Sequence, residues 1–399
     1  MRYIQKYAGS VLICLSVMLI SFSNTLSSPL LTEIAADMGT DVALAGYLPT
    51  ITTLFMGISV MASTVVMEKM GLRYAMTIAM LLVTAGNGFG FCANSFLGLL
   101  AGRALVGIGM GIAGTGFSTV ACDVFRGKAQ SAFVTIYTLG NTLATYVCFA
   151  AAIPLYKLMA RSWRACYLLA AIAAAVLTLA WFIIVRNSEG GCPPAELQKK
   201  QRGLRKAMGD RDVWVLTVYH SLAILCTNII TNYLPSYLQI VRGFEAGEAS
   251  SWSGIISLAG MIGTAVGGAA STALGRRKPV IIVSTLLSLI SMVGLLLWRQ
   301  PAAIVMGIAV FGFCTRCRIP ATTSVSTELR KFDTAFASGA YALMYGVGSV
   351  IGIAAPPALS AATRAVGMET AMLCFAGFLA AAAVISIFVK ETGPCTSSL

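Results

Sequence analysis

The feature that most constrains the fold of this chain is a series of twelve apolar stretches, each at least 19 residues long. A helix rises about 1.5 Å per residue, so about 20 apolar residues cross the hydrocarbon core of a bilayer. Only 11% of the residues are charged and the mean hydropathy is +0.82, so a soluble globule would lack polar surface. We therefore predict an all-α polytopic membrane protein and exclude soluble enzymes, secreted disulfide scaffolds and disordered chains. The predicted spans are 8–30, 43–67, 74–92, 97–119, 129–152, 165–186, 213–239, 249–272, 279–298, 302–325, 334–358 and 367–389.

The loops between the spans divide the chain into two halves. Most loops are short, but residues 187–212 hold six basic residues and a Pro-Pro pair. We predict an N-terminal six-helix bundle over 1–186, a cytoplasmic linker over 187–212 and a C-terminal six-helix bundle over 213–399. The halves also share a pattern, because Gly275 follows Gly71 by 204 residues and Arg277 follows Arg73 by the same 204. Repeated six-helix halves are typical of secondary transporters.

The basic residues predict how the chain is oriented. With the N-terminus inside, 19 of the 28 Lys and Arg fall in cytoplasmic segments, six in outer loops and three within spans. Cytoplasmic loops carry an excess of basic residues in membrane proteins. We expect a multi-pass protein of the cell membrane with both termini cytoplasmic. The net charge of +13 then reflects this bias and does not indicate binding to nucleic acid.

The cysteines give no sign of a metal or redox site. Eleven are present, and only Cys314 and Cys317 form a CxxC pair, without a second pair or a neighbouring histidine. Isolated cysteines in apolar segments behave as small hydrophobic residues. The chain also lacks a nucleotide-binding loop. We expect no metal, no cofactor and no enzymatic activity.

Three segments resemble motifs of the major facilitator superfamily. Glu68-Lys69-Met70-Gly71-Leu72-Arg73 resembles the loop between helices two and three of that family, with Glu68 in place of the usual aspartate. Residues 99–111 are similar to its helix-four motif, with Arg103 as the arginine, and Trp163-Arg164 resembles the usual start of helix six. The resemblance covers essentially the whole chain and implies two pseudo-symmetric six-helix bundles.

The same resemblance implies a cytoplasmic gate. In the family, the loop carboxylate is thought to meet the positive N-terminal end of helix eleven, where an anion is favoured. We expect Glu68, Gly71 and Arg73, with Gly275 and Arg277 in the second half, to form this gate. The alternative is that these charges only set the orientation.

Three arginines lie within predicted spans, whereas all 15 acidic residues lie in loops or at span ends. A buried charge without a partner costs several kcal/mol, so we expect an anionic substrate to compensate it. Arg316 and Arg318 fall near the middle of helix ten, which the resemblance places beside the central cavity. Two residues turn a helix by about 200°, so only one of these arginines can face a given cavity. The alternative for Arg316 and Arg318 is that they pack between helices and bind carbonyl groups. Arg103 is a weaker candidate, near enough to the outer interface to reach it, and the resemblance implies a structural or coupling role as its alternative.

Polar residues on helices one and seven suggest further contacts. Asn24 and Asn228 are the preferred pair for orienting a small polar solute, although such residues also hold helices together. His220, the one histidine, can titrate near neutrality and is a candidate for coupling; the alternative is a structural histidine.

We predict a secondary transporter of small organic anions, resembling the oxalate–formate and monocarboxylate groups and working by alternating access. The lack of an intramembrane carboxylate favours exchange (antiport) or uniport. The alternative is an exporter of amphiphilic drugs driven by protons, although Gly140 lacks the glycine and proline that follow it in the antiporter motif. A membrane enzyme or sensor has no supporting residues. We expect a monomer in the lipid bilayer that binds a small-molecule solute.

Overall fold

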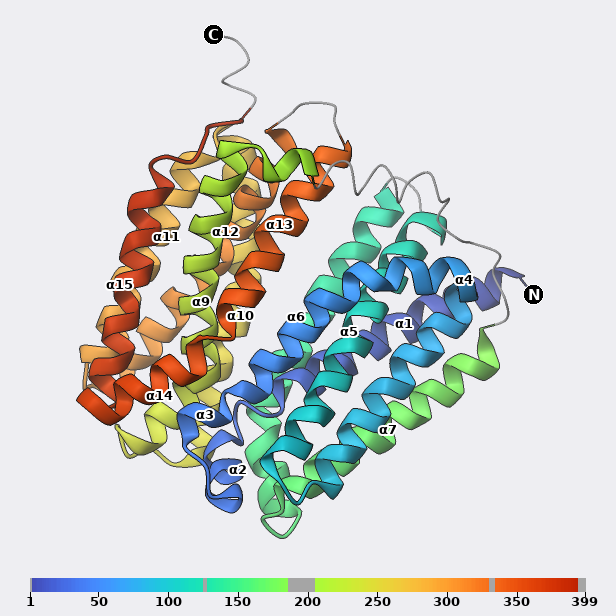
Figure 1. Cartoon of the computed structure of the whole chain (residues 1–399), viewed down its shortest axis with the longest axis horizontal. Coiled ribbons are helices and arrows are strands. Elements are labelled where there is room, and N and C mark those ends of the chain that lie inside the picture. The colour runs from blue at the N-terminus through green and yellow to red at the C-terminus, as the bar shows by residue number, and fades with distance from the viewer. Residues whose placement is uncertain (1, 125–127, 186–204, 330–333, 394–399) are drawn as a thin grey trace. The chain divides into compact units, whose positions relative to one another are not determined.

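The computed structural model describes residues 2–124, 128–185, 205–329 and 334–393, and every regular element in these ranges is a helix (Figure 1). The chain divides into two compact units, Met1–Pro193 and Pro194–Leu399. The division falls inside the predicted linker, whose residues 187–204 lie outside the described part.

The first unit is built around α4 and α5, which pack closely against each other, with α7 on α4 and α6 on α1. Its hydrophobic core includes Ile13, Met76, Phe117 and Trp181. The helices of this unit are α1 (Arg2–Thr25), α2 (Leu31–Met38), α3 (Val42–Ala45), α4 (Tyr47–Cys92), α5 (Phe96–Val124), α6 (Lys128–Leu158) and α7 (Trp163–Ile184).

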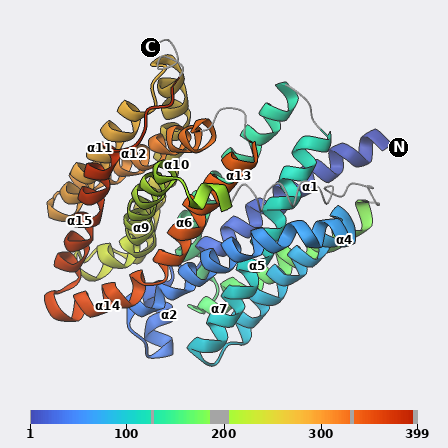
Figure 2. The ribbon, with the colours of Figure 1, turned by 45° about the horizontal axis from the view of Figure 1, so that its top comes forward.

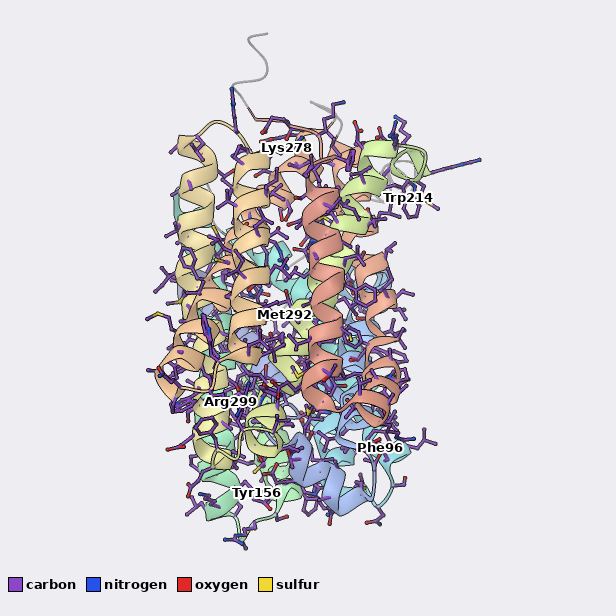
Figure 3. All side chains as sticks on the ribbon, turned by 90° about the vertical axis from the view of Figure 1, so that its left-hand side faces the viewer. Phe96, Tyr156, Trp214, Lys278, Met292 and Arg299 are labelled. Carbon is purple, nitrogen blue, oxygen red and sulfur yellow. The ribbon has the colours of Figure 1, made fainter. Side chains whose placement is uncertain are left out.

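In the second unit, α12 packs on α10 and α11, and α9 packs on α13 and α15. The helices are α9 (Arg211–Ile240), α10 (Ala246–Ala273), α11 (Lys278–Leu297), α12 (Pro301–Glu328), α13 (Thr334–Gly352), α14 (Ala355–Val366) and α15 (Met368–Ser386). Helices α11 and α15 run side by side, as two views show (Figures 1 and 2). Lys278 and Trp214 lie at one end of this unit and Arg299 lies toward the other (Figure 3).

The described residues contain 11 helical stretches long and apolar enough to cross a membrane, and α1 adds the shorter apolar stretch Gly9–Thr25. Together these twelve stretches correspond to the twelve predicted spans. One predicted loop, residues 68–73, is much shorter than expected. Within α4 only Gly71 leaves the helical conformation, with φ +73° and ψ 165°. This positive φ suits glycine, which has no Cβ to clash, and it separates the two crossing stretches of α4.

Two other features differ from the predicted elements. The eleventh span is not one helix over 334–358, because α13 ends at Gly352 and α14 starts at Ala355. Pro356 and Pro357 lie in the first turn of α14, where a missing N–H breaks no helical hydrogen bond, whereas inside a continuous helix it would. The short helices α2 and α3, which follow the first span, were not predicted.

Close contact with α10 fixes the position of α12, the helix that carries Arg316 and Arg318. A Cβ on Gly267 would lie 2.0 Å from the carbonyl oxygen of Cys317, and one on Gly263 would lie 2.1 Å from that of Phe313. Such distances are too short for any side chain. These glycines let the two backbones touch on either side of Arg316.

Candidate functional site

Arg103 lies at the centre of a buried polar network in the first unit. Its Nη1 donates to the carbonyl oxygen of Ser23 at 2.8 Å, and its Nη2 donates to Asn87 Oδ1 at 2.8 Å. The guanidinium also lies 4.7 Å from the ring centre of Tyr167, whose hydroxyl is 2.9 Å from Ser27 Oγ. The side chain is 0% exposed, so the expectation that it reaches the outer interface is wrong. Partners on α1, α4 and α7 hold it inside the bundle.

Arg318 has a similar arrangement in the second unit. Its Nη2 donates to the carbonyl oxygen of Ala223 at 3.0 Å and to Thr227 Oγ1 at 2.9 Å, which joins α12 to α9. The residue is 4% exposed, and its Nη1 is buried without a hydrogen-bond partner among the described residues. Arg318 therefore joins α12 to α9 through Nη2, whereas its Nη1 stays without a described partner.

Arg316 has different surroundings. It lies roughly 22 Å along α12 from Pro301 and roughly 15 Å from Ser326, near the middle of the crossing stretch. Its stem packs on α10, since a Cβ on Gly260 would be 2.6 Å from Arg316 Cγ. The side chain is nevertheless exposed, and no described residue forms a hydrogen bond or an ion pair with it. Its guanidinium is free to bind another group.

His220 lies on α9 close to these arginines. The residue is 4% exposed, its ring centre is 4.6 Å from that of Tyr345, and Arg318 is near enough to interact with it electrostatically. His220 Nε2 is buried without a hydrogen-bond partner among the described residues, as are Thr217 Oγ1 and Ser221 Oγ on the same face of the helix. The second unit thus brings His220, Arg316 and Arg318 together.

The two predicted asparagines lie in different units. Asn24, near the end of α1, is half-buried, and its Oδ1 is buried without a described partner. Asn228 on α9 is half-buried, one residue after Thr227.

The residues predicted to form a gate in the first unit surround the turn at Gly71. Arg73 Nη2 donates to the carbonyl oxygen of Phe182 at 2.7 Å and lies over the Phe182 ring at 4.5 Å. Trp181 Nε1 donates to the carbonyl oxygen of Arg73 at 3.1 Å, so the turn is tied to the end of α7. The side chain of Glu68 and residues 330–333 before α13 lie outside the described part.

The matching turn of the second unit holds a bidentate ion pair. Gly275 has φ +59°, so both paired glycines are in the left-handed region. Arg277 donates to both carboxylate oxygens of Glu328, at 2.9 and 3.3 Å, and also to Ser271 Oγ at 2.8 Å. This pair joins the start of α11 to the end of α12, and at 12% and 29% exposure it is partly shielded from water.

Residues 390–393, which we call the C-terminal clasp, bind four helix ends of this unit. Lys390 pairs with Asp212 at the start of α9 at 3.0 Å, and Thr392 Oγ1 donates to Glu328 at 2.9 Å. Gly393 lies against the carbonyl oxygen of Gly275 at the end of α10. Glu391 accepts hydrogen bonds from the backbone N–H groups of Arg277 and Lys278 at the start of α11.

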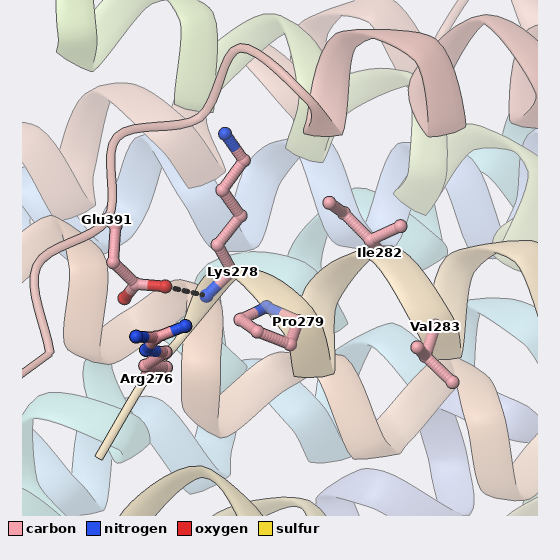
Figure 4. Close-up of a pocket in the computed structure, with 6 residues that line it drawn as sticks. All are labelled: Arg276, Lys278, Pro279, Ile282, Val283 and Glu391. Carbon is pink, nitrogen blue, oxygen red and sulfur yellow. Dashed lines mark hydrogen bonds between the residues drawn. The ribbon is translucent and has the colours of Figure 1, made fainter. Parts of the chain in front are cut away.

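The Glu391 carboxylate caps the N-terminus of α11 (Figure 4). It accepts from the backbone N–H of Arg277 at 2.7 Å and of Lys278 at 3.0 Å, and from those of Thr392 and Gly393 at 3.1 Å each. Burial alone raises the pKa of this carboxyl, but the four N–H groups outweigh it and hold the pKa below its ordinary value. Glu391 also borders an open groove of about 550 Å³, together with Arg276, Lys278, Pro279, Ile282 and Val283.

At the other end of the first unit, Asp37 of α2 accepts from Trp163 Nε1 at 3.1 Å and from Arg164 Nη1 at 2.6 Å. Sequence reasoning found Trp163-Arg164 but missed Asp37, since nothing in the sequence placed the unpredicted α2 beside α7. Glu33, also on α2, has one carboxylate oxygen buried without a described partner, and burial raises its pKa. Within the described ranges no three His, Cys, Asp or Glu side chains group as metal ligands.

The fold and these sites define the protein as a helical, membrane-spanning protein built from two units. The profile of the Major Facilitator Superfamily matches residues 13–272 and 246–397, which include nearly all the described residues. The chain belongs to the Major Facilitator Superfamily.

Two relatives from Bacillus subtilis (strain 168) are named as uncharacterized MFS-type transporters. YbcL is 25% identical over 304 residues, which cover 71% of this chain and 74% of YbcL. YtbD is 24% identical over 274 residues, or 67% of this chain and 65% of YtbD. Among solved structures, the fold is similar to a bacterial homolog of the human lysosomal transporter Spinster in an inward-facing, unoccupied conformation. The TM-score is 0.80 at 15% identity, covering 96% of this chain and 97% of that one. The same homolog in its occupied conformation gives a TM-score of 0.75.

Proposed function

We propose that this transporter carries a small organic anion, of which a carboxylate is the simplest, across the cell membrane by alternating access. The observation that carries the proposal is Arg316, an exposed arginine near the middle of a membrane-crossing helix, without a described hydrogen-bond or ion-pair partner. A guanidinium at that depth cannot face lipid, so its accessible surface faces a water-filled path. A planar guanidinium binds a carboxylate through two parallel hydrogen bonds.

The two arginines of α12 then have separate roles. Arg316 contacts the substrate, whereas Arg318 holds α12 on α9 and adds positive charge nearby. Asn24 and Asn228 orient the solute, and Arg103 is the weakest candidate for contact because protein groups already hold it.

Exchange or uniport is favoured over proton symport. In the described crossing stretches, acidic residues occur only within two or three residues of the start, at Asp212, Glu248 and Glu369. Without a bound anion, the return step would carry uncompensated arginine charge through a closed state; a counter-anion neutralises it. His220 is the candidate coupling residue, because its Nε2 is buried and unpartnered.

The cytoplasmic gate is assigned to the two glycine turns. Gly71 with Arg73 and Gly275 with Arg277 form these turns, and Glu68 is the residue that closes them against helix eleven. We further propose that a cytoplasmic linker over 187–212 joins a six-helix bundle over 1–186 to a second one over 213–399. Both termini are cytoplasmic, and the transporter is a monomer.

The test is uptake of labelled carboxylates into proteoliposomes. Counter-anion inside the vesicles should speed uptake, whereas a pH gradient alone should drive little accumulation. Arg316→Gln should abolish uptake, and the matched change Arg299→Gln, at an exposed loop arginine, should leave it unchanged. Strong accumulation in unloaded vesicles under a pH gradient would overturn exchange. Transport of cationic amphiphiles that is unaffected by Arg316→Gln would favour the drug exporter.

A further inference from the structure

Three aromatic rings form a column beside Arg316 in the second unit. Tyr341 and Tyr345 lie one turn apart on α13, with ring centres 4.5 Å apart. The ring of Tyr345 also lies 4.6 Å from the ring of His220 on α9. All three rings therefore belong to one continuous aromatic surface between α13 and α9.

This surface is next to the free guanidinium. Helix α12 packs on α13, and Arg316 interacts electrostatically with Tyr345. Tyr341 is 41% exposed, so part of the column is accessible, as Arg316 is.

The guanidinium of Arg316 does not itself stack on the rings of Tyr341, Tyr345 or His220. Four other arginines of the described part lie over aromatic rings, whereas Arg316 does not. The site therefore offers a cation whose hydrogen-bond donors have no described partner, beside aromatic faces that no described arginine covers. A ligand that carries both a carboxylate and a flat ring would use both.

We infer that the transporter selects carboxylates that carry a planar aromatic ring, and that Tyr345 is the residue that determines this specificity. This inference rests on the proposed function, because it assumes that Arg316 binds the carboxylate. The carboxylate pairs with Arg316, and the ring packs against Tyr341 and Tyr345 in an offset or edge-to-face arrangement, which aromatic pairs prefer.

The test compares three ligands of similar size by thermal stabilisation of the purified full-length protein. Benzoate has both features, cyclohexanecarboxylate lacks the aromatic ring and benzamide lacks the charge. A ligand that binds only the folded protein stabilises it according to its affinity. We expect benzoate to bind about three- to tenfold more tightly than cyclohexanecarboxylate, and benzamide to bind weakest.

Substitutions then test which residue causes the preference for benzoate over cyclohexanecarboxylate. Tyr345→Leu should bring benzoate down to the affinity of cyclohexanecarboxylate, whereas Tyr345→Phe should keep most of the preference. Phe378→Leu removes an exposed ring from α15 of the same unit and serves as the control, with the preference intact. If Tyr345→Leu does not fold, the ligand ranking on the unaltered protein still tests aromatic selection, and Tyr345→Met, which keeps a long apolar side chain without the ring, tests the role of Tyr345.

The outcomes separate this inference from the proposed function. Equal binding of benzoate and cyclohexanecarboxylate, both above benzamide, would overturn aromatic selection and leave anion transport in place. Equal binding of benzoate and benzamide would overturn the anion site itself. No stabilisation by any of the three would overturn the inference, and uptake of other anions would then test the function.

Discussion

Replacing Glu391 with Gln tests whether the C-terminal clasp stabilises the second unit. In the native protein, Glu391 Oε1 accepts from the N–H groups of Arg277, Thr392 and Gly393, and Oε2 accepts from Lys278. A Gln side chain can keep the first three bonds through its carbonyl oxygen. Its NH2 group would then face the N–H of Lys278, where a donor cannot bond.

The loss of stability in Glu391→Gln can be estimated from the interactions that the carboxylate makes at the N-terminus of α11. Removing a helix N-cap costs about 0.5–2 kcal/mol, and a negative charge near a helix N-terminus contributes about 0.3–1 kcal/mol. Because the carboxylate is only partly buried, water screens its charge and the lower half of these ranges applies. We expect Glu391→Gln to cost about 1 kcal/mol near pH 7.5, and Glu391→Ala about 1.5 kcal/mol.

The effect should depend on pH in a defined direction. The pKa of Glu391 is lowered in the folded protein, so its contribution to stability is fully present above the ordinary pKa of about 4.3. The contribution is lost as pH falls through the lowered folded pKa. Native protein and Glu391→Gln should therefore converge in stability below that value and differ from pH 5 upward.

The assay uses the buried thiols Cys226, Cys314 and Cys317 of the same unit, which react with a fluorogenic maleimide only when the unit unfolds. A loss of about 1 kcal/mol in the free energy of unfolding should lower the midpoint temperature of thermal unfolding by about 2–4 °C. Glu245→Gln is the matched control, because Glu245 occupies the N-cap of α10, is exposed and makes no side-chain cap hydrogen bond. If both variants lower the midpoint equally, or if the Glu391 effect does not shrink as pH falls further below the ordinary pKa of about 4.3, the capping argument is refuted.

Three further predictions concern packing and buried charge. Gly267→Ala should destabilise the second unit by about 1–3 kcal/mol by thermal unfolding, because its Cβ meets a backbone carbonyl at 2.0 Å; Gly268→Ala, with 3.8 Å to the nearest atom, should be neutral or stabilising. Glu33→Gln should raise the unfolding midpoint at pH 7.5 but not at pH 4, because the raised pKa of Glu33 makes its ionisation in the folded protein unfavourable. Arg103→Lys should lower the midpoint of the first unit, with a loss of about 2 kcal/mol, since one ammonium cannot reproduce the geometry of the bonds to Ser23 and Asn87.

The membrane-crossing helices could be predicted because each needs a long apolar run, and that requirement is local in the sequence. The turn at Gly71 was less predictable, since a glycine marks a turn but does not give its length. The break after Gly352 was not predicted within the span 334–358, because the prolines limit where a helix can continue without showing where it stops.

The environment of the charged side chains was not predictable in the same way. Arg103 is buried because Asn87, sixteen residues earlier, and Ser23, eighty residues earlier, present oxygen atoms to it. The cap by Glu391 joins residues 114 apart in sequence. Such partners are set by how helices pack, and no local pattern identifies them. The paired glycine turns were visible because the two halves repeat the same residues.

In the described part of each unit, carbonyl and side-chain oxygens bind a buried arginine, and no described carboxylate pairs with it. Arg103 binds the carbonyl of Ser23, and Arg318 binds that of Ala223. A carbonyl dipole satisfies the N–H donors but cannot cancel a full positive charge, so the surroundings of each arginine stay positive. In the second unit this charge acts on Arg316, whose guanidinium has no hydrogen-bond or ion-pair partner among the described residues. A carboxylate bound at Arg316 would therefore gain from both arginines while touching only one. For this reason we expect the charge of Arg318 to contribute to anion affinity without direct contact.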